Sequence, residues 1–214
     1  MGAFVASAAL ASTPIAATIR NDKKKMKIVA INGSSRKNGN TADMMNLVVQ
    51  ELTAAGHEVE VITLAGETIN PCKACFACVG KGNCVWNNDC FQEIYSKMTG
   101  ADCIILGSPT YSADVSSTLK AVIERASVVS DVNAGMFRHK VGAGLAVGRR
   151  AGTMNALDSL NHFFLNKEMF VVGSTYWPLA YGKLPGDALK DEEGVATMKA
   201  LGQNIAWILE KLKS

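Results

Sequence analysis

The chain has 214 residues, of which 48% are apolar, and this is enough for one α/β domain with a sizeable core. Its net charge of +3 arises from the first 27 residues, because the rest of the chain carries 17 basic and 18 acidic side chains. A nearly neutral body argues against nucleic-acid binding, and no apolar run is long enough to span a membrane.

Residues 1–26 resemble an export signal without matching one fully. The first 17 residues are rich in alanine, serine and small apolar residues, and Ala9-Leu10-Ala11 fits a cleavage site. No Lys or Arg precedes the apolar run, so the basic start of a signal is missing. The segment is a clipped signal, an ordered arm, or an extension upstream of a working start at Met26. We therefore predict a folded domain at residues 27–214 in the cytoplasm, with export as the alternative if residues 1–26 are the remnant of a signal.

Strand and helix patterns alternate along the rest of the chain. Apolar runs predict five strands, at Lys27–Ile31, Val59–Leu64, Ala101–Gly107, Lys140–Val147 and Glu168–Gly173. Helical spacing predicts helices at Ala42–Leu52, Ser116–Val128, Thr153–Phe164 and Glu192–Leu212. Right-handed crossovers place helices on both faces of such a sheet, so the fold class is α/β: a doubly wound, five-stranded parallel sheet in three layers, flavodoxin-like in order. Ligands of such sheets bind outside the carboxyl ends of the strands.

The segment Gly33–Thr41 joins the first strand to the first helix and is typical of a phosphate-binding loop. Its backbone N–H groups would face an anion at the helix N-terminus, and Ser34, Asn40 or Arg36 would add donors or charge. The segment lacks the glycine patterns of nucleotide triphosphate loops and dinucleotide folds, so the terminal phosphate of FMN fits better. The alternative is a polar turn in which Thr41 only caps the helix.

A cysteine-rich loop follows the second strand, at residues 65–90. Its cysteines Cys72, Cys75, Cys78 and Cys84 have the spacing C-x2-C-x2-C-x5-C. Such a run predicts a cubane 4Fe-4S cluster, whereas zinc usually takes two separated C-x2-C pairs. Small buried thiols in a packed loop are the third interpretation. Cys90 is a spare thiol or an alternative ligand.

Other singled-out residues have structural interpretations. Cys103 lies in an apolar strand and is expected in the core, and Gly142 and Gly144 are expected to allow close packing. The three histidines are expected to be structural, and the sequence shows no nucleophile–base set, so no catalytic side chain is predicted.

Taken together, these motifs resemble the iron–sulfur flavoprotein branch of the flavodoxin-like NAD(P)H-dependent FMN reductases. The resemblance rests on the phosphate loop, the four cysteines and three later segments: Gly107–Tyr111, Val147–Arg150 and Pro185–Gly194. It implies FMN contacts in three groups. The phosphate contacts would be Ser34, Arg36, Asn38, Asn40 and Thr41. The ring contacts would be Pro109, Thr110, Tyr111 and Ser112, and the contacts at the pyrimidine end would be Gly148, Arg149 and Arg150.

The sequence departs from the family pattern at two places that bear on the flavin. Ala151-Gly152-Thr153 stands where paired glycines are more common, and Ser112-Ala113-Asp114-Val115 stands where a bulky aromatic residue or glycine is common. The ring contacts in these two loops are therefore less well defined by the resemblance.

The resemblance implies an electron-transfer flavoprotein with FMN and a 4Fe-4S cluster. Its donor would be a ferredoxin-like protein or NAD(P)H, its acceptors small molecules such as quinones, dioxygen or peroxide, and its assembly a homodimer or homotetramer. The alternatives are an NAD(P)H-dependent FMN or quinone reductase without a cluster, and a flavodoxin-like module with structural zinc.

Overall fold

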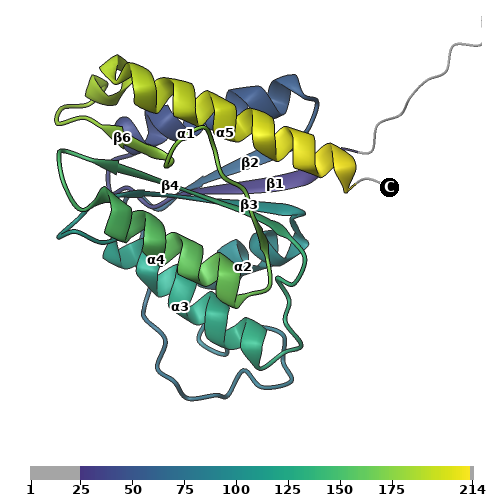
Figure 1. Cartoon of the computed structure of the whole chain (residues 1–214). Helices are drawn as coiled ribbons and strands as arrows, with labels where there is room; N and C mark the ends of the chain where they lie inside the picture. The colour runs from purple at the N-terminus through teal and green to yellow at the C-terminus, as the bar shows by residue number, and fades with distance from the viewer. Residues whose placement is uncertain (1–24, 213–214) are drawn as a thin grey trace, which may run out of the picture.

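The computed structural model describes residues 25–212, in which a parallel sheet lies between two layers of helices (Figure 1). Its strands are β1 (Lys27–Asn32), β2 (Glu58–Thr63), β3 (Cys103–Pro109), β4 (Val141–Gly148), β5 (Phe170–Val171) and β6 (Leu179–Tyr181). Their order is β2-β1-β3-β4-β5, with β6 also pairing with β4, and every pairing is parallel. The predicted flavodoxin-like, doubly wound sheet is confirmed.

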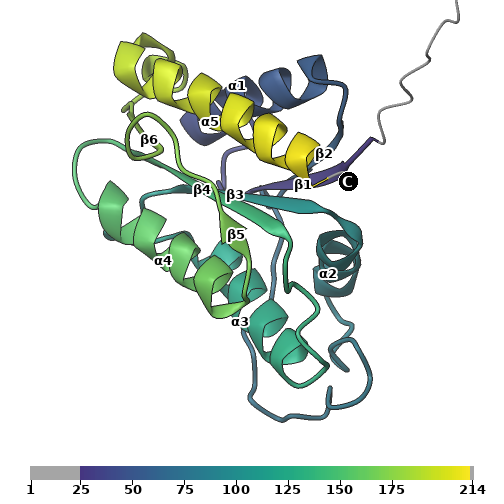
Figure 2. The same ribbon diagram turned by 45° about the vertical axis from the view of Figure 1, so that its right-hand side comes forward.

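Two groups of helices cover the two faces of the sheet. The α-helices are α1 (Asn40–Ala54), α2 (Phe91–Gly100), α3 (Ser117–Asp131), α4 (Thr153–Asn166) and α5 (Glu192–Lys211), and a short 3₁₀ helix, η1, spans Asp187–Lys190. Helices α1 and α5 pack together on one face, and α2, α3 and α4 lie on the other (Figures 1 and 2). Strands β3 and β4 are buried along their whole length because both of their faces are covered.

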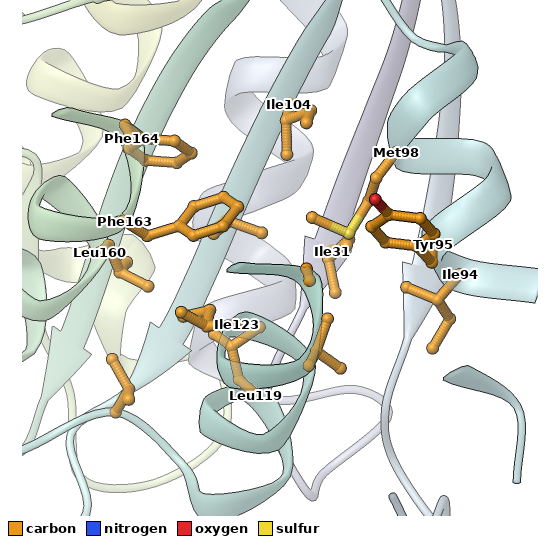
Figure 3. Packing of buried hydrophobic residues seen from close by; sticks show 14 of the residues in the cluster. Ile31, Ile94, Tyr95, Met98, Ile104, Leu119, Ile123, Leu160, Phe163 and Phe164 are labelled. Carbon is orange, nitrogen blue, oxygen red and sulfur yellow. The ribbon is translucent and has the colours of Figure 1, made fainter. Parts of the chain in front are cut away.

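The core below the sheet is built from aliphatic and aromatic side chains of α2, α3 and α4, several of which Figure 3 shows. Tyr95 stacks on Phe91 at 5.5 Å between ring centroids and meets Phe137 edge-on at 5.7 Å. Phe163 continues this row against Phe137. These rings join α2 to α4 through Phe137, which lies between α3 and β4, and each large buried ring contributes about 3–5 kcal/mol relative to alanine.

Close packing of α4 against β4 requires the two glycines of that strand. A side chain at Gly142 would meet the Phe164 ring at 2.7 Å, and one at Gly144 would meet Leu160 at 3.1 Å. Their interpretation as packing residues is confirmed. Cys103 is fully buried in β3, as predicted.

Three elements differ from the prediction. Helix α2 was not predicted, although its buried residues Phe91, Ile94, Tyr95 and Met98 have helical spacing. Strand β5 has only two residues: the left-handed backbone of Glu168 (φ 55°) prevents an extended strand from beginning there, and the strand ends at Val171, before the predicted end at Gly173. The unpredicted β6 takes up the pairing with β4 farther along the same edge.

The predicted leader, residues 1–26, lies almost wholly outside the described residues. Met26 is described: its side chain is buried in the core with α1 and α5, and its carbonyl accepts the Glu58 N–H at 3.1 Å. Among residues 25–212, no helix is both long and apolar enough to cross a membrane.

Candidate functional site: a flavin cleft and a cysteine loop

The loops after β1, β3 and β4 leave the sheet at one edge and enclose a cleft of about 230 Å³. Strand register explains their meeting, since Asn32 pairs with Gly107 and Pro109 pairs with Val147. We call this hollow the flavin cleft. Its lining includes nine predicted FMN contacts: Ser34, Arg36, Asn40, Thr41, Pro109, Thr110, Tyr111, Gly148 and Arg149. Three others, Asn38, Ser112 and Arg150, are exposed on the same loops and do not line it.

The phosphate loop has a backbone conformation fixed by its own polar side chains. Asn32 Oδ1 accepts the Ser34 N–H at 3.0 Å, and Ser34 Oγ accepts the Arg36 N–H at 3.1 Å. Helix α1 then begins after Gly39, which has no side chain that could cap its first N–H groups. Thr41 is therefore not the cap but a buried residue of the first turn. These N–H groups and the helix dipole suit an anion.

Charge in the flavin cleft has one sign. Arg36, Arg149 and Lys183 line it, and none of its lining residues carries a carboxylate. An anionic group is therefore attracted to the cleft by charge as well as by hydrogen bonds.

The loop after β3 makes a tight turn against the phosphate loop. Tyr111 and Asp114 exchange two backbone hydrogen bonds, of 2.9 and 3.0 Å, around Ser112 and Ala113, which both have positive φ. Non-glycine residues at these angles carry strain, which is common at ligand sites. The Tyr111 and Ser35 hydroxyls lie 2.9 Å apart, so the turn and the phosphate loop are joined across the cleft.

Asp114 attaches the same turn to α4. Its carboxylate accepts the Ser159 hydroxyl at 2.6 Å and the Val115 N–H at 2.7 Å. The Ser159 hydrogen bond is the main cause of an Asp114 pKa below the usual value. The turn that carries Tyr111 is thus held by Ser35 of the phosphate loop and by Ser159 of α4.

The loop after β4 approaches closely because of two glycines. A side chain at Gly148 would meet Thr153 at 2.5 Å, and one at Gly152, where φ is 86°, would meet Ala113 at 2.7 Å. Here the departure from paired glycines matters little, because the glycine that the turn needs is Gly152. Thr153 in turn lies 3.0 Å from the Tyr181 hydroxyl, so α4 and β6 are linked beside the cleft.

The sequence prediction missed the contribution of the segment after β6. Gly182 and Lys183 line the cleft, and a side chain at Gly182 would overlap the Asn40 amide. Asn40 also accepts the Ala188 N–H at 3.3 Å, which fixes this segment to the phosphate loop. The short strand β6 that places it carries no clear sequence signal.

A buried hydroxyl tests whether the cleft suits a polar ligand. Thr110 Oγ1 is inaccessible to solvent and has no hydrogen-bond partner among the described residues, and Thr110 lines the cleft. A buried polar atom without a partner is costly, and a ligand with donors and acceptors would remove the cost. Together with the cationic lining and the free helix start, this fits FMN.

The cysteine loop, residues 65–90, has no helix or strand and lies beside α3, below the sheet in Figures 1 and 2. Cys72, Cys75, Cys78 and Cys84 line one small hollow of about 20 Å³, which has room for about one water molecule. Within residues 25–212, no three Cys, His, Asp or Glu side chains lie together as a metal ion would need. Cys90 does not line the hollow.

The thiols of this hollow differ in acidity. The pKa of Cys75 is lowered, mainly because the Ala77 N–H donates to its sulfur. Burial raises the pKa of Cys78, and the neighbouring cysteine thiols add to the effect. Burial and Glu67 raise the pKa of Cys90 to about 11. Four thiols around one hollow are a suitable donor set for iron, although their sulfurs must move closer to ligate it.

A family comparison decides the class of this protein. The model of the NADPH-dependent FMN reductases matches residues 26–183. The chain belongs to this family. An iron–sulfur flavoprotein of Methanocaldococcus jannaschii is 36% identical over 88% of the chain and all of that protein. One of Archaeoglobus fulgidus is 33% identical over 88% of the chain and 98% of that protein.

A solved structure supports the fold of this FMN reductase family member. The NAD(P)H:quinone oxidoreductase of Methanothermobacter marburgensis superposes with a TM-score of 0.62 at 15% identity, over 85% of the chain and 97% of that structure. The predicted membership of the iron–sulfur flavoprotein branch is confirmed by the relatives, and the chain is an FMN-dependent oxidoreductase.

Proposed function

We propose that this protein is an electron-transfer flavoprotein that holds FMN in the flavin cleft and a 4Fe-4S cluster on Cys72, Cys75, Cys78 and Cys84. The observation that carries the proposal is that all four cysteines line one hollow in a chain whose relatives are iron–sulfur flavoproteins. FMN exchanges electrons in pairs or singly and a cubane cluster moves one at a time, so together they can connect one-electron and two-electron partners.

The residues of the flavin cleft have separate roles in this proposal. Ser34, Arg36, Asn40 and Thr41, with the first N–H groups of α1, bind the FMN phosphate. Pro109, Thr110 and Tyr111 lie along the ring, and Gly148 and Arg149 border its pyrimidine end. A cation at that end stabilises negative charge on the reduced ring and raises its potential. Asn38, Ser112 and Arg150 remain proposed contacts from the same loops.

The proposed donor is a ferredoxin-like protein or NAD(P)H, and the proposed acceptors are small molecules such as quinones, dioxygen or peroxide. NADPH is the donor in the description of the family, and NAD(P)H and a quinone are substrates in the name of a structural relative. We also propose a homodimer or homotetramer, since Phe76 and Trp86 of the cysteine loop are exposed and aromatic residues are enriched at interfaces. The proposed location is the cytoplasm.

Anaerobic purification followed by counting of iron, acid-labile sulfide and flavin tests the proposal. We expect one FMN per chain together with equal amounts of iron and sulfide, four of each. Flavin without iron, with rapid bleaching by NADPH, would instead show an FMN reductase whose cysteines carry no cluster. Zinc without flavin would contradict the proposal completely.

A further inference from the structure

The cysteine loop depends on side chains of another element for its shape. It has no helix or strand of its own between Thr63 and Phe91, and Ala74 and Phe76 within it have positive φ. A loop of this length is ordered only where its backbone is held. Two side chains on or just after α3, Arg125 and Asn133, hold it.

Arg125 binds both ends of the segment that contains the four cysteines. Its guanidinium donates to the Asn70 carbonyl at 3.4 Å, before the first cysteine, and to the Trp86 carbonyl at 2.8 Å, after the last. It also forms an ion pair of 2.6 Å with Asp89 and lies 4.0 Å from the centre of the Phe91 ring. Both charged side chains are almost completely buried, at 3% and 2% exposure.

Asp89 completes the junction from the loop side. Its carboxylate accepts the Asn70 N–H at 2.9 Å, the Asn70 side-chain amide at 3.1 Å and the Phe91 N–H at 3.1 Å. A buried ion pair is stable only when its remaining polar groups are satisfied, and here they bind the loop backbone. The pair therefore holds together the two ends of the segment that contains the four cysteines, at Asn70 and at Trp86 to Asp89.

Asn133 holds the middle of the same segment. Its amide donates to the Cys78 carbonyl at 2.9 Å and accepts the Gly82 N–H at 2.9 Å. It is fixed in turn by the Val129 carbonyl of α3, at 2.7 Å. Side chains on and just after α3 thus hold both the ends and the middle of the segment, and Gln92 of α2 also donates to the Cys84 carbonyl at 2.7 Å.

Helix α3 also begins beside the phosphate loop that lines the flavin cleft. Its cap, Ser116, donates to the Gly33 carbonyl of the phosphate loop at 2.6 Å and binds Ser108 at the end of β3. Arg125 lies farther along the helix and lines the hollow of the four cysteines. The two candidate cofactor sites are therefore connected through one rigid element.

We propose that Arg125, paired with Asp89, is a positioning residue of the cluster site: it holds the cysteine loop ready for cluster assembly, and the charges of the pair tune the potential of the cluster. The inference rests on the proposed function for the cluster, but not for the positioning of the loop. The observation that supports the proposal is the burial of two opposite charges beside the cysteines.

Limited proteolysis of the full chain without iron tests the positioning. Trypsin can cut the loop after Lys73 and Lys81, both of which are exposed. In Arg125→Gln and Asp89→Asn we expect cleavage at these two sites to be at least about tenfold faster than in wild type, because the loop opens locally. Arg138→Gln is the matched control, since Arg138 forms an exposed ion pair with Glu168 away from the loop. It should leave the cleavage rate unchanged.

Reduction potentials of the reconstituted proteins distinguish an electrostatic effect of the pair on the cluster from a purely structural role. Both variants break the same ion pair, but Arg125→Gln leaves a carboxylate beside the hollow and Asp89→Asn leaves a guanidinium. We expect the cluster potential to become more negative in the first and more positive in the second. A residue that only supports the fold would move both potentials in the same direction. Arg125→Lys keeps the positive charge, so its cluster potential should stay close to that of wild type, and its loop should be cleaved more slowly than in Arg125→Gln.

The outcomes are decisive in each case. Unchanged cleavage and iron loading in both variants, or potentials that shift together, would overturn the proposal. If Arg125→Gln does not fold, as judged by circular dichroism, Arg125→Lys and Asn133→Ala decide the positioning through cleavage after Lys81. If wild type binds flavin but no iron, the proposed cluster fails, whereas the cleavage results still decide whether the pair positions the loop.

Discussion

The flavin cleft and the cysteine loop obtain their shapes by different means. The cleft lies at the carboxyl ends of three neighbouring strands, so the register of the sheet fixes the distance between its walls. The cysteine loop follows the edge strand β2 and has no strand pairing of its own; Ile69 and Cys78 pack in the core, and side chains such as Arg125 and Asn133 bind its backbone. The walls of the cleft are set by backbone pairing, whereas the loop is held by side-chain contacts and a few long-range hydrogen bonds.

The difference predicts how each site responds to change. A cleft built on regular elements should keep its shape when a single polar side chain is lost, even where ligand binding weakens, but not when an atom is added where two segments meet closely. A loop held by side chains should be sensitive to single contacts and tolerant of bulk on its exposed face. The experiments below test this contrast from the largest expected effect to the smallest.

Replacing one proposed cluster ligand should remove the cluster from the cysteine loop while FMN stays bound in the flavin cleft. In Cys75→Ala we expect loss of the cluster with FMN retained, and a free energy of unfolding within about 0.5 kcal/mol of wild type before iron is added, because Cys75 is exposed. Iron, sulfide and flavin counting is the measurement. Cys90→Ala is the control, since Cys90 does not line the hollow, and it should keep its iron. Loss of FMN together with iron would show that the two sites are not separable.

An added methyl group at Gly33 should disturb the cleft through its backbone. The new atom would meet Leu119 at 2.8 Å and the Gly107 carbonyl at 3.0 Å. We expect Gly33→Ala to lower the free energy of unfolding by about 1–3 kcal/mol and to weaken FMN binding. Urea unfolding and flavin fluorescence titration measure the two effects. Gly100→Ala, where the new atom meets nothing, should change neither binding nor packing.

Removing one cation of the cleft should weaken FMN binding without unfolding the protein. Arg36 lines the cleft and its neighbour Lys37 does not, so the two make a matched pair. A charge-assisted hydrogen bond contributes about 1.5–3 kcal/mol, and we expect the Kd for FMN to rise about 10- to 100-fold in Arg36→Gln. Lys37→Gln should change it little. Riboflavin, which lacks the phosphate, should bind both variants alike; equal weakening for riboflavin would exclude Arg36 as a phosphate contact.

The smallest effect concerns the turn beside Tyr111. The folded protein lowers the pKa of Asp114, chiefly through the Ser159 hydroxyl, with Lys120 adding a weaker attraction. A lowered pKa stabilises the fold above the unfolded value of 3.8, and this stabilisation is lost as the pH falls through the folded value. We expect Ser159→Ala to cost about 0.5 kcal/mol near pH 6, since the site is largely exposed. Unfolding curves of the two proteins should converge at low pH, and a constant difference would contradict this role.

Much of the fold could be predicted because the spacing of apolar residues along a short stretch of chain reports which faces of a strand or helix are buried. The apolar runs of β1, β3 and β4 reflect burial on both faces, which their residues report directly. Strand β5 was predicted to begin too early because composition does not show the left-handed backbone of Glu168. Strand β6 escaped prediction because three residues give too little periodicity to be recognised.

The candidate site divides in the same way. The phosphate loop and the cysteine spacing are local motifs, and the structure groups nine predicted flavin contacts in one cleft and four cysteines around one hollow. Gly182 and Lys183 were not foreseen, because they follow the phosphate loop by more than 140 residues and only the tertiary fold brings them to the cleft. Arg125 was missed because an arginine on an amphipathic helix ordinarily faces solvent, whereas here it is buried against Asp89.

The sequence by itself determined the alternation of strands and helices, the phosphate loop and the thiol donor set, because each depends on residues close together in the chain. Only the tertiary structure decided which loops meet, how Ser112 and Ala113 turn, and which charges are buried beside the cysteines. These features depend on packing between distant segments, and the free energy of a buried contact belongs to the pair rather than to either residue.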